Sequence, residues 1–238
     1  MIEISGLTKR FGALEVLRGL DLSIARGRVT AIVGPNAAGK TTLIKSILGL
    51  TRPDAGAIRV NGANIIGDGD AYRARIGYMP QAPRLPENLT GAEVLAMLRD
   101  LRGPGATVDE SLIDAFGMRG ELGKQLRTLS GGTRQKVNAV AAFLFEPELL
   151  ILDEPTAGLD PVASGVLKDR IRAARAAGTT FIITSHIMSE LEELADDVAF
   201  LVDGGVRFAG ALGALKREMH QDNLECAVAQ MMMRGRAA

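Results

Sequence analysis

The sequence predicts an α/β fold, and three patterns lead to that prediction. A glycine-rich loop at 34–41 lies between an apolar run at 29–33 and an apolar-periodic segment at 42–50, the order of a strand, a turn and a helix. The run at 149–152 is continuously apolar, as expected of a strand buried on both faces. A helical pattern at 161–177 then precedes another buried strand at 180–184, so strands and helices alternate.

The remaining elements follow from alternation, turn residues and helix caps. Alternating apolar and polar residues at 2–7 and 20–24 are typical of half-buried antiparallel strands, and strands at 198–202 and 206–208 flank a turn. Asp160 and Pro161 supply an N-cap and first-turn proline, and capping boxes are predicted at Thr90 with Glu93 and at Ser189 with Glu192. The tail from 211 is predicted to be helical, with a frayed end at 231–238.

A helical segment interrupts the α/β pattern. Three prolines in the stretch 80–86 end the preceding strand, and the pattern from about 82 to 145 is helical. The sequence therefore predicts one domain: a core with a mixed sheet and an N-terminal antiparallel β subdomain at about 1–81 and 146–210, an inserted α-helical subdomain at about 82–145, and a C-terminal helical tail at about 211–238.

Composition excludes some partners and favours one compartment. Lys plus Arg and Asp plus Glu number 28 each, so no overall charge favours nucleic acid, and none is expected as a partner. A single cysteine, Cys226, and a start without basic and apolar signal regions favour a cytoplasmic protein. No apolar run approaches the roughly 20 residues that cross a bilayer, so any membrane role is expected to come through a partner.

The loop at 34–41 fits the pattern G-x-x-x-x-G-K-[ST] completely, in the strand-to-helix context that the pattern requires. In such loops backbone N–H groups and a helix N-terminus surround the phosphates of a nucleoside triphosphate. Lys40 is expected to reach the β- and γ-phosphates, and the Thr41 hydroxyl to ligate Mg²⁺. A P-loop NTPase core binding ATP and Mg²⁺ is thus predicted, with nucleotide-binding residues Gly34, Pro35, Asn36, Ala37, Ala38, Gly39, Lys40, Thr41 and Thr42.

Two further groups of residues can serve a nucleotide. Asp153 and Glu154 follow the strand at 149–152, where Asp153 could hold Mg²⁺ through a water and Glu154 could polarise the attacking water; the alternative is that both cap a turn. Ser130, with two glycines, opens a helix as a second anion cradle or as an ordinary N-cap. Three residues carry little weight singly: Phe11, which could stack on a purine, Gln81 and His186.

Taken in order, these motifs resemble the ATP-binding subunit of an ABC transporter over nearly the whole chain. The resemblance implies an adenine-stacking Phe11, a signature at 129–135, catalytic roles for Glu154, His186 and Gln81, and metal ligation by Thr41, Gln81 and Asp153. It further implies nucleotide contacts from Ser130, Gly131, Gly132, Gln135 and Asp160. Two residues depart from the family pattern, Ala37 in place of Gly and Thr133 in place of Gln. Ala37 calls the local backbone angle into question, because alanine tolerates positive φ poorly.

The resemblance also implies partners. The signature of one subunit would close on the γ-phosphate held by a second copy, in a head-to-tail homodimer with ATP between the subunits, bound to an integral membrane permease at the inner face of the cell membrane. The short helical lobe and the lack of an appended regulatory domain look more like exporter-type systems. The segment at 86–90 is also similar to the copper-processing ATPase of nitrous oxide reductase maturation.

Two other functions remain open at this point. A P-loop kinase would need a phosphate acceptor and would require neither Ser130 with its glycines nor Glu154. A soluble ABC ATPase without a transport role would act as a nucleotide-dependent interaction module. Such proteins usually carry coiled coils or two cassettes on one chain, and this sequence has neither.

Overall fold

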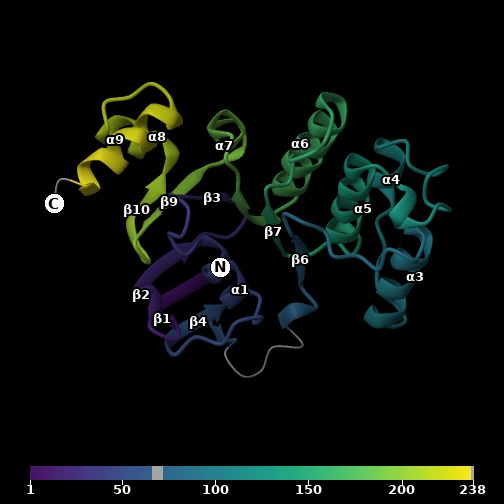
Figure 1. The fold of residues 1–238 in the computed structure, drawn as a ribbon, viewed down its shortest axis with the longest axis horizontal. Helices are drawn as coiled ribbons and strands as arrows, with labels where there is room; N and C mark the ends of the chain where they lie inside the picture. Colours follow the sequence, from purple (N-terminus) through teal and green to yellow (C-terminus); the bar gives the residue numbers. More distant parts are fainter. Residues whose placement is uncertain (66–71, 237–238) are drawn as a thin grey trace. The chain divides into compact units, whose positions relative to one another are not determined.

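The computed structural model describes residues 1–65 and 72–236, and the chain divides into two compact units (Figure 1). Unit 1 comprises Met1–Arg73 and the chain from Thr180 onward, and unit 2 comprises Ala74–Thr179. Unit 2 therefore contains strands as well as the helical segment. The subdomain boundaries predicted near 81 and 146 stay a prediction.

Unit 1 is built from two sheets and the helices that follow them. In chain order its described elements are β1 (Ile2–Phe11), β2 (Leu14–Ile24), β3 (Val29–Val33), α1 (Lys40–Ile47), β4 (Ala55–Val60), β5 (Ala63–Asn64), β8 (Thr180–Thr184), α7 (Met188–Leu194), β9 (Asp197–Val202), β10 (Gly205–Ala211), α8 (Leu212–Glu218) and α9 (Leu224–Arg236).

The two sheets of unit 1 confirm the predicted mixture of antiparallel and parallel strands. The N-terminal sheet is antiparallel, in the order β2-β1-β4-β5, with Ile4 opposite Leu22 on one side and Ile58 on the other. In the second sheet β3 pairs in parallel with both β8 and β9, and β10 returns antiparallel along β9. Every residue of β3 and of β8 is buried, which explains their nearly unbroken apolar sequences.

One predicted helix start in unit 1 is wrong. The capping box at Ser189 does not form, because α7 begins at Met188 and its N-cap residue, Ile187, makes no side-chain cap. Glu192 has partners far along the chain instead: its carboxylate accepts hydrogen bonds from Lys216 Nζ at 2.6 Å and from the Leu224 backbone N–H at 3.0 Å. Burial opposes the charged form, yet these two bonds hold the pKa of Glu192 below its ordinary value.

The C-terminal tail is helical as predicted, and the helix includes residues 231–236 of the stretch that was predicted to be frayed. Helix α9 continues to Arg236, and Met231 is buried within it. The Glu192 carboxylate accepts a hydrogen bond from the backbone N–H of Leu224, the first residue of this helix, and α9 packs against both α7 and α8. Residues 237 and 238 lie outside the described part of the chain.

Unit 2 contains a parallel strand pair and a group of helices. In chain order its described elements are β6 (Ile76–Met79), α3 (Gly91–Arg102), α4 (Ser111–Ala115), the 3₁₀ turn η1 (Leu126–Thr128), α5 (Gly131–Phe143), β7 (Leu149–Asp153) and α6 (Pro161–Ala176).

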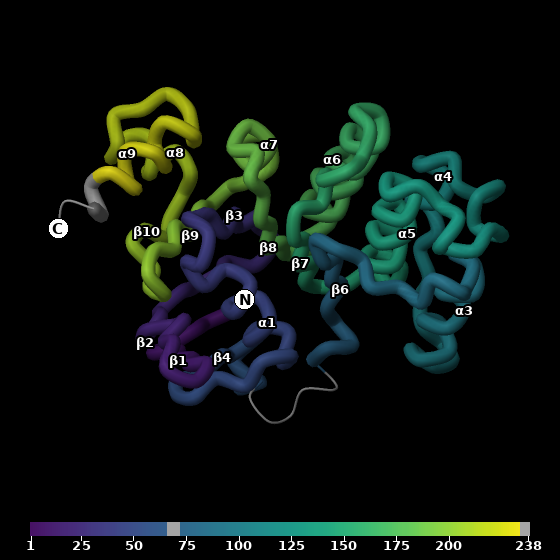
Figure 2. The backbone as a smooth tube through the Cα atoms, in the orientation of Figure 1, coloured from purple at the N-terminus to yellow at the C-terminus, as the bar shows by residue number. Residues whose placement is uncertain are grey.

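The helices of unit 2 are inserted between its two strands. Figure 2 traces the chain from β6 through α3 and α4 and back along α5 into β7. The strands pair in parallel, with Ile76 opposite Leu149. The capping box predicted for α3 is confirmed, because the Glu93 N–H donates to Thr90 Oγ1 at 3.1 Å while the Thr90 N–H donates to Glu93 Oε2 at 2.8 Å. This cap starts the helix after the proline-rich stretch.

Strand β6 and helix α5 meet at Gly77. A Cβ at this position would lie 2.1 Å from the Ala142 carbonyl oxygen and 2.6 Å from Leu150 Cδ2. Both distances are far inside van der Waals contact, and the nearest atom is backbone. Only glycine therefore allows α5 to approach β6 this closely.

Replacing Gly77 with alanine is expected to destabilise the protein by about 1–3 kcal/mol, because the added methyl overpacks a backbone contact. The matched control is Gly165→Ala in α6, where an added Cβ meets nothing within 4 Å. That change should be neutral or stabilise by up to about 1 kcal/mol, since alanine is the better helix former. Urea unfolding measures both, and equal stability of the two variants would contradict the packing argument.

Candidate functional site

The phosphate loop follows the carboxyl end of β3 and leads into α1. Gly34 has φ 151° and Gly39 has φ 101°. A Cβ on Gly34 would lie 2.1 Å from the Leu201 carbonyl oxygen, and one on Gly39 would lie 3.0 Å from the Val16 carbonyl oxygen. The loop is thus packed directly against the backbones of β2 and β9, which fixes it at the end of the central strand.

Lys40 lies across this loop. Its Nζ donates to the carbonyl oxygens of Gly34 at 2.7 Å and of Pro35 at 3.0 Å. Gly39, the N-cap of α1, has no side chain to cap the helix, and the first turn contains no acidic residue. The first N–H groups of α1 and the Lys40 ammonium therefore concentrate positive charge at one place, which suits an anion.

The backbone at Ala37 does adopt a positive φ, the angle that alanine tolerates poorly. It has φ 64°, in the left-handed region, where a non-glycine residue costs about 1–2 kcal/mol. The loop keeps its shape because the neighbouring glycines and the packing against β9 determine it. The departure from glycine is accommodated as local strain.

The other two predicted site residues in unit 1 are exposed. Phe11 is the last residue of β1, not part of the loop after it, and 53% of its surface is exposed. Lys9 Nζ lies 5.3 Å from the centre of its ring. His186 follows β8, which is parallel to β3, so His186 and the phosphate loop both follow carboxyl ends of neighbouring strands. Ligands of α/β proteins commonly bind at that edge.

In unit 2 the two carboxylates lie at the end of β7. The strand ends at Asp153, and Glu154 follows with φ 53° and only 8% of its surface exposed. Strain of this kind in a non-glycine residue is typical of functional sites, because the surrounding structure must enforce it. Burial raises the pKa of Tyr78 on β6, and the negative charge of Asp153 raises it further.

The residues of the predicted signature form the start of α5. Ser130 is the N-cap, and its Oγ accepts from the Thr133 N–H at 3.1 Å. A Cβ on Gly132 would lie 2.9 Å from the Gly158 carbonyl oxygen, so this turn packs closely on the chain just before α6. Gly131, by contrast, faces open space.

Asp160 begins α6 as predicted. Its Oδ1 accepts from the Ala163 N–H at 2.8 Å, and Lys136 Nζ on α5 lies 3.3 Å from its Oδ2. The Ala163 bond, supported by Lys136, holds the pKa of Asp160 below its ordinary value. Lys136, which pairs α5 with the start of α6, had no local signal in the sequence.

Helix α5 also holds two loops of unit 2 through buried amides. Gln135 Nε2 lies 3.4 Å from the Pro155 carbonyl oxygen, next to Glu154, and Asn138 Nδ2 donates to the Pro80 carbonyl oxygen at 2.9 Å, next to the exposed Gln81. Asn138 also donates to Gln135 Oε1 at 3.3 Å. The nucleotide contact predicted for Gln135 stays a prediction.

Sequence reasoning missed Asn138. Its signal was a second polar residue three positions after Gln135, on a helix face that is otherwise apolar. Both amides are 3% exposed, and a buried amide costs free energy unless it is hydrogen-bonded. Their hydrogen bonds inside the unit identify them as supports of the two loops.

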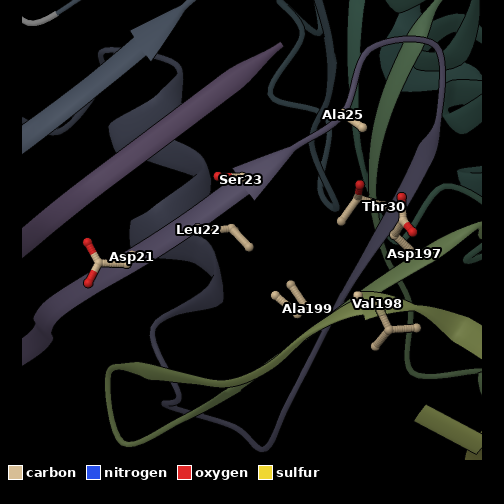
Figure 3. A pocket seen from close by; sticks show the side chains of 10 residues that line it. Asp21, Leu22, Ser23, Ala25, Thr30, Asp197, Val198 and Ala199 are labelled. Atoms are coloured by element: carbon tan, nitrogen blue, oxygen red, sulfur yellow. The ribbon is translucent and has the colours of Figure 1, made fainter. Parts of the chain in front are cut away.

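Unit 1 also contains a pocket of about 410 Å³ (Figure 3). Its lining comes from β2 and Ala25 just after it, from β9 and β10, and from Thr30, near the amino end of β3. The phosphate loop follows the opposite end of that strand. The Thr30 hydroxyl is buried without a hydrogen-bond partner in the described part of the chain. The pocket is therefore distinct from the anion cradle.

Replacing Ala37 with glycine is expected to stabilise the protein by about 0.5–1 kcal/mol, because glycine adopts φ 64° without steric cost. Ala38→Gly is the matched control. Ala38 is buried and has no positive φ, so this change should destabilise by about 0.4–1 kcal/mol. Chemical unfolding compares the two, and an Ala37→Gly variant less stable than the unmodified protein would contradict the strain.

Comparison with known proteins gives the family. Residues 17–157 match the family model described as ABC transporter. The chain is 38% identical to the daunorubicin resistance ATP-binding protein DrrA3 of Streptomyces coeruleorubidus, over 94% of this chain and 72% of that protein. It is 35% identical to the Nod factor export ATP-binding protein I of Ralstonia nicotianae, over 88% of this chain and 66% of that protein.

Solved structures agree. A structure of an ATP-binding subunit of an ABC transporter superposes with a TM-score of 0.89 at 33% identity, covering 97% of this chain and 99% of that one. A dimeric ATP-binding cassette in a post-hydrolysis state, bound to ADP and Pi, has the same fold, with a TM-score of 0.78 at 24% identity over 89% of this chain and 99% of that one.

The expected resemblance to a copper-processing ATPase receives no support from these relatives, which are named for drug resistance and Nod factor export. Within residues 1–65 and 72–236, no helix has the length and apolar character needed to cross a membrane. The family model covers more than half of the chain, and the relatives align along nearly all of it. This chain therefore belongs to the ABC transporter family, as one of its ATP-binding and ATP-hydrolysing cassettes.

Proposed function

We propose that this cassette hydrolyses ATP to drive a separate integral membrane permease of the exporter type. The observation that carries the proposal is the cradle formed by Lys40 and the uncapped start of α1 at the end of β3. The names of the relatives, which concern drug resistance and Nod factor export, favour export. The substrate itself would be recognised by the permease.

Nucleotide binding would use the residues of unit 1. The Lys40 ammonium would exchange its two loop carbonyls for the β- and γ-phosphate oxygens, since a charged acceptor is the stronger partner. The Thr42 side chain and the loop N–H groups would surround the same phosphates. The exposed ring of Phe11 is available for stacking on the adenine.

Mg²⁺ suits the residues proposed to hold it. Thr41, Gln81 and Asp153 offer a hydroxyl, an amide and a carboxylate oxygen, the hard oxygen ligands that Mg²⁺ prefers. When bound, the ion would neutralise charge on the phosphates.

Hydrolysis would depend on Glu154. Its carboxylate would accept a proton from the attacking water, and the strained backbone with 8% exposure would restrict it to one orientation. His186 would help to orient the water and the γ-phosphate. Gln135 bonds to the Pro155 carbonyl oxygen, and Asn138 bonds to the Pro80 carbonyl oxygen. A displacement of the Gln81 loop would therefore be transmitted through α5 to Glu154.

The outer face of the γ-phosphate would be covered by a second copy of the chain. Ser130 and Gly131 are exposed at the start of α5, next to the half-buried Gly132, and this helix N-terminus could supply hydrogen bonds in trans. Two identical cradles and two identical helix starts give two sites in a twofold head-to-tail dimer. The exposed apolar side chains Met97 and Leu101 on α3 are candidates for the permease contact.

Lys40→Ala is expected to weaken ATP binding by about 10- to 100-fold, because a hydrogen bond between charged groups is lost at the phosphates. Lys45→Ala, an exposed lysine later in α1, should bind normally. Isothermal titration of both variants tests the proposal. Unchanged affinity in Lys40→Ala would show that Lys40 does not contact the phosphates.

Glu154→Gln is expected to lower kcat for phosphate release by about 100-fold or more, because the amide keeps the shape but cannot accept the proton. ATP binding should be retained, and size-exclusion chromatography with ATP and Mg²⁺ should give a stable dimer. Glu148→Gln, exposed just before β7, should hydrolyse ATP normally. Wild-type turnover in Glu154→Gln would mean that the base is another residue.

A further inference from the structure

The departure from the family signature at Thr133 forms a side-chain contact of its own. Thr133 Oγ1 lies 2.9 Å from Ser130 Oγ, and the Thr133 backbone N–H donates to the same Ser130 Oγ at 3.1 Å. The hydroxyl and the backbone N–H of Thr133 therefore both lie within hydrogen-bond distance of Ser130 Oγ. The two residues lie one helical turn apart at the start of α5.

A hydroxyl forms a limited number of hydrogen bonds, and this limit bears on where the Ser130 proton can point. A serine hydroxyl has one donor and accepts two bonds. If the N–H and the O–H of Thr133 fill both acceptor positions, the proton of Ser130 has no partner inside the turn. It can only be directed outward, where Gly131 leaves open space.

Either hydroxyl could donate in this contact, and burial favours Thr133 as the donor. Thr133 is half-buried, whereas Ser130 is exposed. A half-buried hydroxyl gains more from an internal acceptor, because it reaches water less easily. The Ser130 carbonyl accepts from the Arg134 N–H at 2.9 Å, and the oxygen that lies beside the Thr133 hydroxyl is Ser130 Oγ, at 2.9 Å.

We propose that Thr133 is a positioning residue that directs the Ser130 hydroxyl proton toward the γ-phosphate held by a second copy of the chain. The inference rests on the proposed function, in which Ser130 acts in trans. Thr133 itself would not contact the nucleotide. Its hydroxyl would orient the donor before ATP arrives, so that less ordering is needed when the dimer closes.

The test uses the Glu154→Gln background, in which ATP is retained, and measures the ATP concentration that gives half-maximal dimer. Thr133→Val keeps the shape and the backbone N–H but removes the hydroxyl, and it should raise this concentration about fivefold, the effect of one ordinary hydrogen bond. Thr133→Ser should restore the original value. ADP affinity of the monomer should be unchanged in both, because ADP lacks the γ-phosphate.

Thr128→Val is the matched control. It removes a hydroxyl that donates to the Gln125 carbonyl at 2.7 Å, just before the same turn, and it should leave ATP-dependent dimerisation unchanged. Thermal unfolding of each variant checks that α5 remains folded.

An unchanged or lower ATP requirement in Thr133→Val overturns the inference, because Ser130 would then be the donor to Thr133. A Thr133→Ser variant as impaired as Thr133→Val also overturns it, since the hydroxyl would not be the active group. The Ser130→Arg variant distinguishes a failure of the proposed site in trans from a failure of the role inferred for Thr133. If that change leaves the dimer intact, the site in trans fails together with the inference, whereas a dimer sensitive to Ser130→Arg but not to Thr133→Val defeats the inference alone.

Discussion

Holding a triphosphate with backbone N–H groups is the constraint on which the rest of the structure depends. The loop must bend so that its N–H groups converge, and this requires positive φ at Gly34, Ala37 and Gly39. It must also be held against neighbouring strands, which the close approach of Gly34 to Leu201 provides. The buried strand β3 places this loop at the end of the sheet, and α1 supplies the positive helix terminus. The fold of unit 1 can be understood as the support for that one turn.

Unit 2 depends on a different kind of support, the buried polar side chains of α5. Gln135 and Asn138 connect the helix to the loops that carry Glu154 and Gln81, and Lys136 connects it to Asp160. A buried amide left without a partner would be costly, so these bonds restrict the loops to particular positions relative to the helix. The helix that follows Ser130 is therefore also the element that holds the two loops to which we assign catalytic roles.

Features determined by neighbouring residues could be predicted from the sequence, whereas those determined by distant residues could not. The phosphate loop, the Thr90 cap and the Asp160 cap are local patterns, and the structure contains each of them. The predicted Ser189 cap does not form: α7 begins at Met188, one residue before Ser189, and Glu192 bonds instead to Lys216 and Leu224, residues more than twenty positions away. The left-handed backbone of Glu154 had no local signal either, because no glycine or asparagine marked it. The supports of the site were hidden for the same reason, since their partners are distant in the chain.

We propose that the γ-phosphate is held by Lys40 of one subunit and by Ser130 of another. The most direct measurement is a crystal structure of the Glu154→Gln variant with ATP and Mg²⁺. We expect a head-to-tail dimer in which Lys40 Nζ and the Ser130 hydroxyl of the second copy each lie within about 3 Å of γ-phosphate oxygens, the distance of a charge-assisted hydrogen bond. A γ-phosphate contacted only by residues of its own subunit, with Ser130 in solvent, would contradict the account.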